Sequence, residues 1–243
     1  MNDTQLIEAI RLIVREELTT AICTGVIDAW NSHIQVDTVG IMRAASTLRS
    51  AEFVRHNIPL HLGKTHLALR RDAVLAAAPE GLFLEFGVWK GYWINEMARV
   101  RPDVKFFGFD SFEGLPEPWE FRDRGAFGLD GIMPVVEANV TLIKGWFDQT
   151  LCKFLDNTPD MVSFAHIDCD LYTSTITVLE TLRPRMRIGT QIVFDDFMVA
   201  PNWEFEEHKA FFDFVKRWGI KYEYTGWSNQ APACSAGIVI TCI

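Results

Sequence analysis

Acidic side chains follow two short apolar runs in the second half of the chain. Residues 161–167 end at Asp168, and residues 190–194 end at the pair Asp195 and Asp196. The interval between the two runs suits a strand, a helix and a return strand, so the runs can be neighbours in a parallel sheet. In such sheets ligands bind at the edge formed by the carboxyl ends of the strands. We therefore expect Asp168, Asp195 and Asp196 to converge at that edge.

Three carboxylates that converge in this way need a partner. Packed together they repel one another and lose hydration, so they must be protonated, hydrated or neutralised by a cation. Oxygen ligands select a hard ion, Mg²⁺ above all, or else Ca²⁺ or Mn²⁺. The sequence predicts a divalent-metal site formed by Asp168, Asp195 and Asp196. The alternative is that acids such as Asp170 and Asp196 cap helices or turns, and we interpret Asp170 as a cap for a helix that starts near Thr173.

A glycine-containing loop follows an earlier apolar run, residues 82–86. Gly87 and Gly91 allow the backbone to approach a ligand without a Cβ clash, and the next helix offers free N–H groups. The third glycine of the dinucleotide fingerprint is replaced by Ile94, which argues against a pyrophosphate. S-adenosylmethionine (SAM) carries a carboxylate and an ammonium instead. Glu85 is our candidate for bonding that ammonium, directly or through water.

Asp110 ends the next apolar run, residues 104–109. An acid at this place can accept hydrogen bonds from both hydroxyls of a ribose, which SAM and NAD share. The alternative is a tight turn in which Asp110 caps the segment that follows. Trp89 is placed to reach the cofactor, whereas we expect Trp93 in the core.

These residues need a sheet to position them. After the first 80 residues, apolar runs alternate with helix-compatible stretches, which predicts a mostly parallel sheet with helices on both faces. Residues 221–225 and 237–243 predict a C-terminal antiparallel strand pair. Residues 1–80 have a helical pattern that begins with a helix over residues 4–31. We predict a helical N-terminal extension over residues 1–80, for oligomerisation or as a lid on the acceptor pocket, and a SAM-binding domain over residues 81–243.

The composition excludes several other functions. There are 32 acidic and 23 basic residues, a formal net charge of −9, and no basic run, which argues against nucleic-acid binding. The five cysteines form no Cys-x-x-Cys pair, so we expect a reduced, cytoplasmic protein. No signal peptide and no bilayer-spanning stretch is expected. The amphipathic first helix predicts a homo-oligomer.

Two histidines lie near the acids in the sequence. We expect the side chain of His166 to point to the opposite face from Asp168 and to be hydrogen-bonded in the core. His208 follows Glu204 by four positions, which is typical of an exposed helix pair. The alternative is a histidine on the substrate side of the metal site. The aromatic residues of the loop before residue 128 predict a mobile lid or an ordinary surface loop: Trp119, Phe121 and Phe127.

Five blocks of the sequence, in this order, resemble the macrocin O-methyltransferase family. They are residues 84–91 (LEFGVWKG), 109–116 (FDSFEGLP), 144–147 (KGWF), 168–175 (DCDLYTST) and 195–197 (DDF). The second block is the most specific, and the resemblance extends over about residues 81–218. Family members are SAM- and Mg²⁺-dependent sugar O-methyltransferases of antibiotic tailoring with a Rossmann-like, class I fold. The resemblance therefore implies O-methylation of a hydroxyl on a small molecule, a sugar or other vicinal diol of a natural product.

The resemblance also implies roles for individual residues. Asp168, Asp195 and Asp196 would hold the metal, and Asp168 would double as the base that takes the hydroxyl proton. Asp110 would face the SAM ribose with its neighbour in the second block, and the tryptophan of the third block would lie near the adenine. The complete predicted cofactor set is Glu85, Gly87, Trp89, Gly91, Asp110, Ser111, Gly145, Trp146 and Asp168. Cys169 departs from the family, in which a glycine is usual at this position.

One other enzyme class uses a similar acidic motif. Metal-dependent glycosyltransferases bind a sugar-nucleotide through an Asp-x-Asp site, which residues 168–170 match. That alternative leaves the glycine loop at residues 87–91 and Asp110 unexplained. A binding module that keeps the fold without catalysis is a further alternative, and the retained acids argue against it.

Overall fold

The computed structural model describes Thr24, residues 38–228 and residues 234–243. The helix expected over residues 4–31 lies outside the described residues apart from Thr24. The described residues from Ser46 onward form one compact unit. No helix among the described residues is long and apolar enough to cross a membrane.

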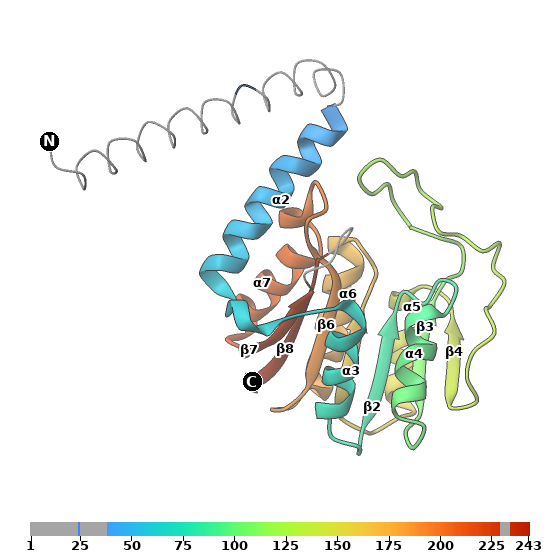
Figure 1. Ribbon diagram of the computed structural model, residues 1–243. Helices are drawn as coiled ribbons and strands as arrows, with labels where there is room; N and C mark the ends of the chain where they lie inside the picture. Colours follow the sequence, from blue (N-terminus) through green and yellow to red (C-terminus); the bar gives the residue numbers. More distant parts are fainter. Residues whose placement is uncertain (1–23, 25–37, 229–233) are drawn as a thin grey trace, which may run out of the picture. The chain divides into compact units, whose positions relative to one another are not determined.

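An eight-stranded sheet forms the centre of the described fold (Figure 1). Its order is β1-β7-β8-β6-β5-β2-β3-β4, and every paired neighbour is parallel except β8, which is antiparallel to β6 and β7. The strands are β1 (Gly63–Lys64), β2 (Leu82–Phe86), β3 (Phe106–Asp110), β4 (Val140–Lys144), β5 (Val162–Ile167), β6 (Gln191–Met198), β7 (Lys221–Ser228) and β8 (Cys234–Cys242). The predicted parallel sheet with a C-terminal antiparallel pair is confirmed.

Helices cover both faces of the sheet (Figure 1). They are α2 (Thr38–Asn57), α3 (His66–Ala76), α4 (Tyr92–Val100), α5 (Phe147–Asp156), α6 (Tyr172–Leu182) and α7 (Glu207–Trp218), with short 3₁₀ helices η2 (Leu60–Leu62), η3 (Arg183–Arg185) and η4 (Trp203–Phe205). Helices α3 and α4 pack on one face, and α5, α6 and α7 pack on the other. The element β1 and helix α3 precede residue 81, yet β1 pairs with β7 and α3 packs on β5 to β8.

The apolar runs form strands because they can be buried on both faces. Every residue of β2 and of β5 is buried, as expected for the central strands of a parallel sheet. Side chains alternate, so Leu84 joins the core under α5 to α7 while Phe83 joins the core under α3 and α4. The carboxyl ends of these strands are thereby fixed at one edge.

Candidate active site

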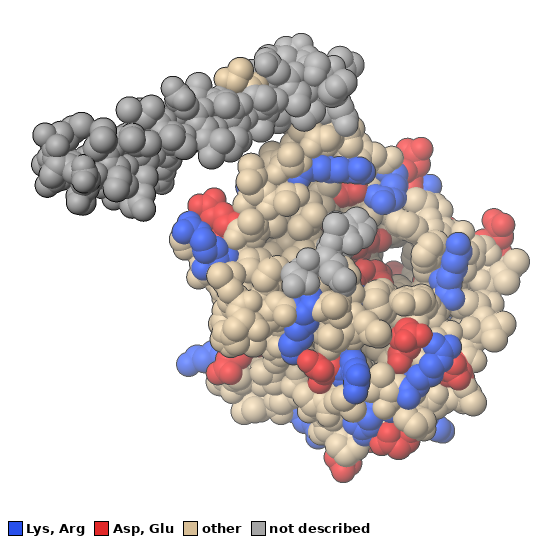
Figure 2. Space-filling model, in the orientation of Figure 1, with Lys and Arg blue, Asp and Glu red and all other residues tan. Residues whose placement is uncertain are grey.

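A cavity of about 830 Å³ opens at the carboxyl ends of β2, β3, β5 and β6. Figure 2 shows the hollow in the surface, with acidic side chains inside it. Most of the predicted site residues line this cavity: Gly87, Trp89, Asp110, Ser111, Gly145, Trp146, Asp168, Asp195 and Asp196. Glu85 and Gly91 are not among its lining residues. The glycine loop of residues 87–91, which is the predicted donor loop, and the predicted acids therefore lie around one cavity at the edge of the sheet.

The glycine loop after β2 is tied to the end of β3. Asp110 accepts hydrogen bonds at Oδ2 from the backbone N–H groups of Val88 and Trp89, at 2.9 and 2.7 Å. Its Oδ1 accepts from Phe112 N at 2.7 Å, so Asp110 does cap the segment that follows it. Because Asp110 also lines the cavity, a ribose there would share the carboxylate with these amides. The capping and the ribose-binding interpretations are therefore compatible.

Gly87, directly after β2, lies against the backbone of Asp168, directly after β5. Its φ of +89° is in the left-handed region. A Cβ at this position would lie 1.7 Å from the carbonyl oxygen of Asp168. Only glycine fits there, whereas Gly91, with φ of +79°, provides the backbone turn into α4.

The far end of the cavity follows β4. Gly145 has a φ of +140°, and its N–H donates to the carbonyl of Asp110 at 2.9 Å. Trp146 precedes α5 and lines the cavity with Phe147. Ser111 is buried, and its Oγ accepts from Glu113 N at 3.0 Å. Trp146 and Phe147 together form an apolar wall of the kind that an adenine ring would contact.

Glu85 lies beneath the cavity. Its side chain is 1% exposed, and its Oε1 accepts a hydrogen bond from His166 Nδ1 at 2.8 Å. Burial, followed by the charge of Asp168, raises the pKa of Glu85 well above its usual value. Its Oε2 has no hydrogen-bond partner among the described residues. The contact of Glu85 with the SAM ammonium stays a prediction.

A buried chain of polar groups links Glu85 to Asp195. Arg70 on α3 is 1% exposed, and its Nε donates to His166 Nε2 at 3.0 Å. His166 therefore accepts at Nε2 and donates from Nδ1, which is the neutral tautomer. Burial lowers its pKa well below the usual value. Arg70 also forms an ion pair with Asp195 Oδ1, and its guanidinium lies 3.9 Å from the centre of the Trp93 ring.

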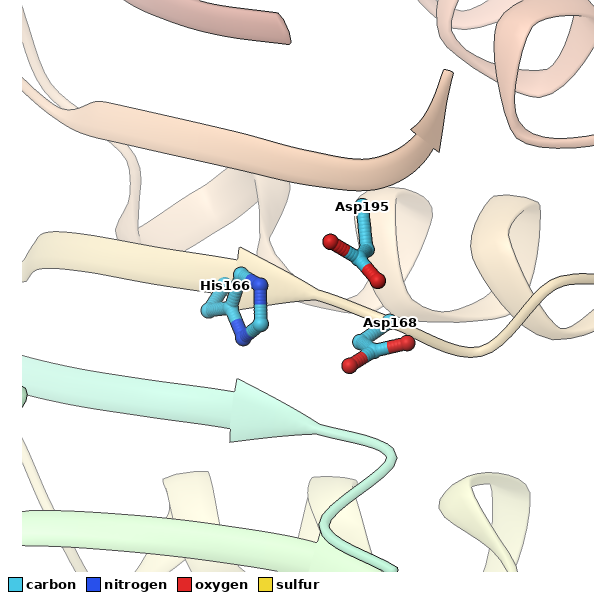
Figure 3. Close-up of side chains that lie close together, drawn as sticks. All are labelled: His166, Asp168 and Asp195. Atoms are coloured by element: carbon cyan, nitrogen blue, oxygen red, sulfur yellow. The ribbon is translucent and has the colours of Figure 1, made fainter. Parts of the chain in front are cut away.

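The two predictions for His166 have different outcomes. Its burial and hydrogen bonding are confirmed, because the side chain is 0% exposed and bonded at both ring nitrogens. The prediction that it points away from Asp168 is wrong. Residues two apart in a strand share a face. Ligand atoms of His166, Asp168 and Asp195 lie within 4.8 Å of one another (Figure 3).

The acids at the cavity edge divide differently from the prediction. A second group with ligand atoms within 4.8 Å consists of Asp168, Asp170 and Asp196. Asp195 and Asp196 are adjacent in β6, so their side chains leave the strand on opposite sides. Asp195 is engaged by Arg70, whereas Asp196 meets Asp170. Among the described residues, the predicted trio therefore does not form a single group, and Asp170 replaces Asp195 in it.

Asp170 is not the helix cap that the sequence indicated. Helix α6 begins at Tyr172 after Leu171, without a side-chain capping bond. Burial raises the pKa of Asp170 well above its usual value and also raises that of Asp196. Burial, with the charge of Asp196, raises the pKa of Asp168 to about 7. One buried and two partly buried carboxylates at this spacing are a donor set that fits a hard divalent cation.

The loop between β3 and β4 forms one wall of the cavity. Trp119 is 6% exposed and shares a small core with Leu115 and Leu171. The guanidinium of Arg122 lies 4.7 Å from the Trp119 ring centre and 5.2 Å from that of Phe127. Phe121, also predicted in a lid, is 52% exposed and is not among the lining residues.

His208 occupies a place that neither sequence interpretation foresaw. Its ring lies among the rings of Phe53, Phe197, Trp203 and Phe212, with centroids 4.5 to 5.0 Å away. Its expected partner Glu204 bonds Arg49 instead. The interpretation as an exposed helix pair is therefore wrong, and His208 is not among the residues lining the cavity.

Residues 84–197 match the protein-family model described as a methyltransferase domain. The chain is 29% identical over 174 residues to the 8-demethyl-8-(2,3-dimethoxy-alpha-L-rhamnosyl)-tetracenomycin-C 4'-O-methyltransferase of Streptomyces olivaceus, covering 61% of the chain and 63% of that protein. It is 27% identical over 160 residues to the demethyldecarbamoylnovobiocin O-methyltransferase of Streptomyces niveus, covering 55% and 60%. The matched region thus spans about three-fifths of the length of these curated relatives.

Solved structures show the same fold. The calicheamicin methyltransferase CalS11 superposes with a TM-score of 0.57 at 22% identity, over 82% of this chain and 91% of that one. The O-methyltransferase NovP gives 0.54 at 21% identity, over 72% and 79%. The sequence resemblance to sugar and natural-product O-methyltransferases is thereby confirmed. The match to the methyltransferase-domain model covers the glycine loop, Asp110 and the acids up to Asp196, and the fold is that of the class I methyltransferase structures.

Proposed function

We propose that the chain is a SAM-dependent O-methyltransferase that acts on a hydroxyl group of a small molecule, a sugar or other vicinal diol of a natural product. The observation that carries this proposal is the match of residues 84–197 to a methyltransferase domain, because those residues supply both ends of the cavity. Both curated relatives bear the names of O-methyltransferases of antibiotics, and the first is named for a rhamnosyl acceptor. These relatives give no support to the glycosyltransferase alternative.

SAM would lie across the carboxyl ends of β2 and β3. Gly87 lines this part of the cavity, and Asp110 holds the loop in place through Val88 and Trp89. The adenine would contact Trp146 at the far end of the cavity. When bound, SAM would supply the methyl group, and Asp168 at the end of β5 lines the same cavity. This arrangement uses the crevice where ligands bind in open α/β sheets.

A divalent cation fits the acid cluster. Asp168, Asp170 and Asp196 offer only oxygen atoms, and holding three charged carboxylates this close together without a cation is costly. When bound, such an ion supplies positive charge that lowers the pKa of an acceptor hydroxyl. Asp195 lies at the same edge of the sheet. Its Oδ1 forms an ion pair with Arg70 and accepts a hydrogen bond from Ser235 Oγ. Mg²⁺ is the cation we propose.

Asp168 is the residue we assign as base. It is fixed by the hydrogen bond from its own N–H to the carbonyl of Phe86 at 2.9 Å. It lines the cavity between the donor loop and Asp196, where it can take the proton of an acceptor hydroxyl. The rest of the rate enhancement would come from positioning, because methyl transfer needs the acceptor oxygen within about 3–3.5 Å of the methyl carbon.

The first part of the chain belongs to the proposal as well. We propose that residues 1–80 extend the methyltransferase domain of residues 81–243 and serve in oligomerisation or in closing the acceptor pocket. We also propose that the protein is a homo-oligomer that acts on a small-molecule acceptor and does not bind nucleic acid. Light scattering of the full chain and of a chain without residues 1–37 compares the two roles.

The test is transfer of a labelled methyl group from SAM to candidate diols, followed by mass spectrometry of the products. We expect Asp168→Asn to lower kcat by about 10²- to 10⁴-fold, the usual contribution of a positioned base, while SAM binding is retained. The matched control is Asp160→Asn, an exposed acid before β5. Labelled product in the presence of EDTA would exclude the cation. A complete lack of methyl transfer with every diol, despite SAM binding, would oppose the proposed activity.

A further inference from the structure

The turn between β5 and α6 brings the acids to the cavity in a strained conformation. Asp170 has a φ of +62°, in the left-handed region that residues with a side chain rarely adopt. The N–H of Leu171 donates to the carbonyl of Cys169 at 2.6 Å, only two residues back. Such a backbone persists when surrounding contacts hold it.

Those contacts come from the first turn of α7. Glu207 is 0% exposed, and its Oε1 accepts from Cys169 N and Asp170 N, both at 3.1 Å. The neighbouring Glu206 accepts from Tyr172 N at 2.9 Å through its Oε2. Two adjacent glutamates at one helix end therefore satisfy three amides of the strained turn.

Burying Glu207 has a cost that its two hydrogen bonds offset only in part. Its Oε2 has no hydrogen-bond partner among the described residues, and the side chain lies near enough to Asp196 and Asp168 to feel their charges. A carboxylate placed so close to other acids does not stabilise the cluster by its charge. Its contribution is the double acceptor that fixes where Asp168 and Asp170 point.

We propose that Glu207 is a positioning residue that holds the turn from Asp168 to Asp170 in the geometry that binds the divalent cation. This inference rests on the proposed function, in which those acids take up a cation. Glu207 acts from behind the turn through the backbone N–H groups. It is not among the residues that line the cavity.

The test measures cation binding apart from methyl transfer. Mn²⁺ titrations followed by electron paramagnetic resonance give the cation affinity, and calorimetry with S-adenosylhomocysteine gives the affinity of the donor site. We expect Glu207→Ala to weaken Mn²⁺ binding by about 10- to 100-fold, the usual effect of losing a group that orients metal ligands. Binding of S-adenosylhomocysteine, at the β2 and β3 side, should stay close to that of the wild type.

Glu207→Gln separates the hydrogen bonds from the charge. The glutamine carbonyl can accept from the same two amides, so this variant should bind Mn²⁺ nearly as the wild type does. Glu207→Asp, too short to reach both amides, should be intermediate, and it replaces Glu207→Ala if that variant fails to fold. The control is Glu204→Ala, which removes a nearby carboxylate that pairs with Arg49 rather than with the amides of the turn.

The outcomes distinguish this inference from the proposed function. Wild-type Mn²⁺ affinity in Glu207→Ala, or an equal loss in Glu207→Gln, would overturn the positioning role and leave the methyltransferase proposal intact. A wild-type chain that binds S-adenosylhomocysteine but no Mn²⁺ would overturn the cation step and this inference together.

Discussion

At the scale of single residues, the site depends on how closely two strand ends approach. The N–H of Asp168 bonds the carbonyl of Phe86, and the next residue, Gly87, passes directly over the carbonyl of Asp168. The glycine loop of residues 87–91 (the donor loop) and the turn from Asp168 to Asp170 (the acid turn) are therefore joined through backbone atoms. Any side chain at Gly87 must push the two apart, which would move the loop of residues 87–91 relative to Asp168.

Gly87→Ala should reduce the free energy of unfolding substantially. The new Cβ would meet the Asp168 carbonyl at 1.7 Å, in addition to the strain of φ +89°. The matched control is Gly189→Ala, where φ is +91° and nothing lies within 4 Å of the Cβ. We expect the control to cost about 1–2 kcal/mol from the left-handed backbone, and Gly87→Ala to cost about 1–3 kcal/mol more from overpacking. Urea denaturation measures both, and equal losses would contradict the close approach.

At the scale of elements, α7 supports the site from outside the cavity. Its first turn and the residue before it supply Glu207 and Glu206 to the acid turn. The next residue, His208, packs among aromatic rings from α2, β6 and η4 as well as from α7 itself. The start of α7 thus contacts both the α2 segment around Phe53, through His208, and the turn that carries the acids, through Glu207.

The histidine of this aromatic cage should make stability fall in acid. Burial lowers the pKa of His208 from its usual 6.5 to about 4, so the unfolded chain binds this proton more readily than the folded one. The stability that the folded protein gains from burying the neutral His208 imidazole is present in full above pH 6.5 and is lost as the pH falls to about 4. At about 1.4 kcal/mol per pKa unit, the loss is at most about 3 kcal/mol.

The measurement is urea unfolding of the wild type and of His208→Leu between about pH 8 and pH 4. The difference in stability between the two chains should shift in favour of the variant as the pH falls. Comparing two chains is necessary because buried acids with raised pKa values act in the opposite direction: Asp168, Asp170, Asp196 and Glu207. A difference that stays constant across this range would mean that His208 titrates normally.

At the scale of the whole molecule, the strand order decides where the cavity lies. From β2 the chain proceeds outward to β3 and β4, and then returns to the other side of β2 with β5 and β6. The connections therefore diverge between β2 and β5, leaving a crevice at their carboxyl ends. The donor loop lies on one side of that switch point and the acid turn on the other, as Figure 1 allows the reader to follow.

Ligand binding at this crevice should stabilise the entire unit. Because both sides of the sheet contribute to the site, S-adenosylhomocysteine should raise the melting temperature, with about 2.7 kcal/mol of stabilisation at a hundredfold excess over Kd. UDP should leave it unchanged. A thermal-shift comparison with and without Mg²⁺ checks this, and stabilisation by UDP alone would favour a glycosyltransferase.

The amino-acid sequence by itself determined the strands and the residues at their ends. Apolar runs of this length, separated by helix-compatible stretches, favour the buried strands of a parallel sheet, and the polar residue that ends each run then lies at the edge of the sheet. Asp110 and Asp168 were therefore predictable from a local pattern. The sequence predicted that Gly87 lets the backbone approach a ligand, whereas the group that needs the space in the structure is the carbonyl of Asp168.

Only the tertiary structure decided how the acids are grouped and held. The side-chain alternation in β6 sends Asp195 to Arg70 and Asp196 to Asp170, and Glu207 reaches the turn from 37 and 38 residues away. A buried charge is tolerated where packing brings it a partner. No local pattern in the sequence records that pairing, because Arg70 and Glu207 lie in helices whose charged residues are usually exposed.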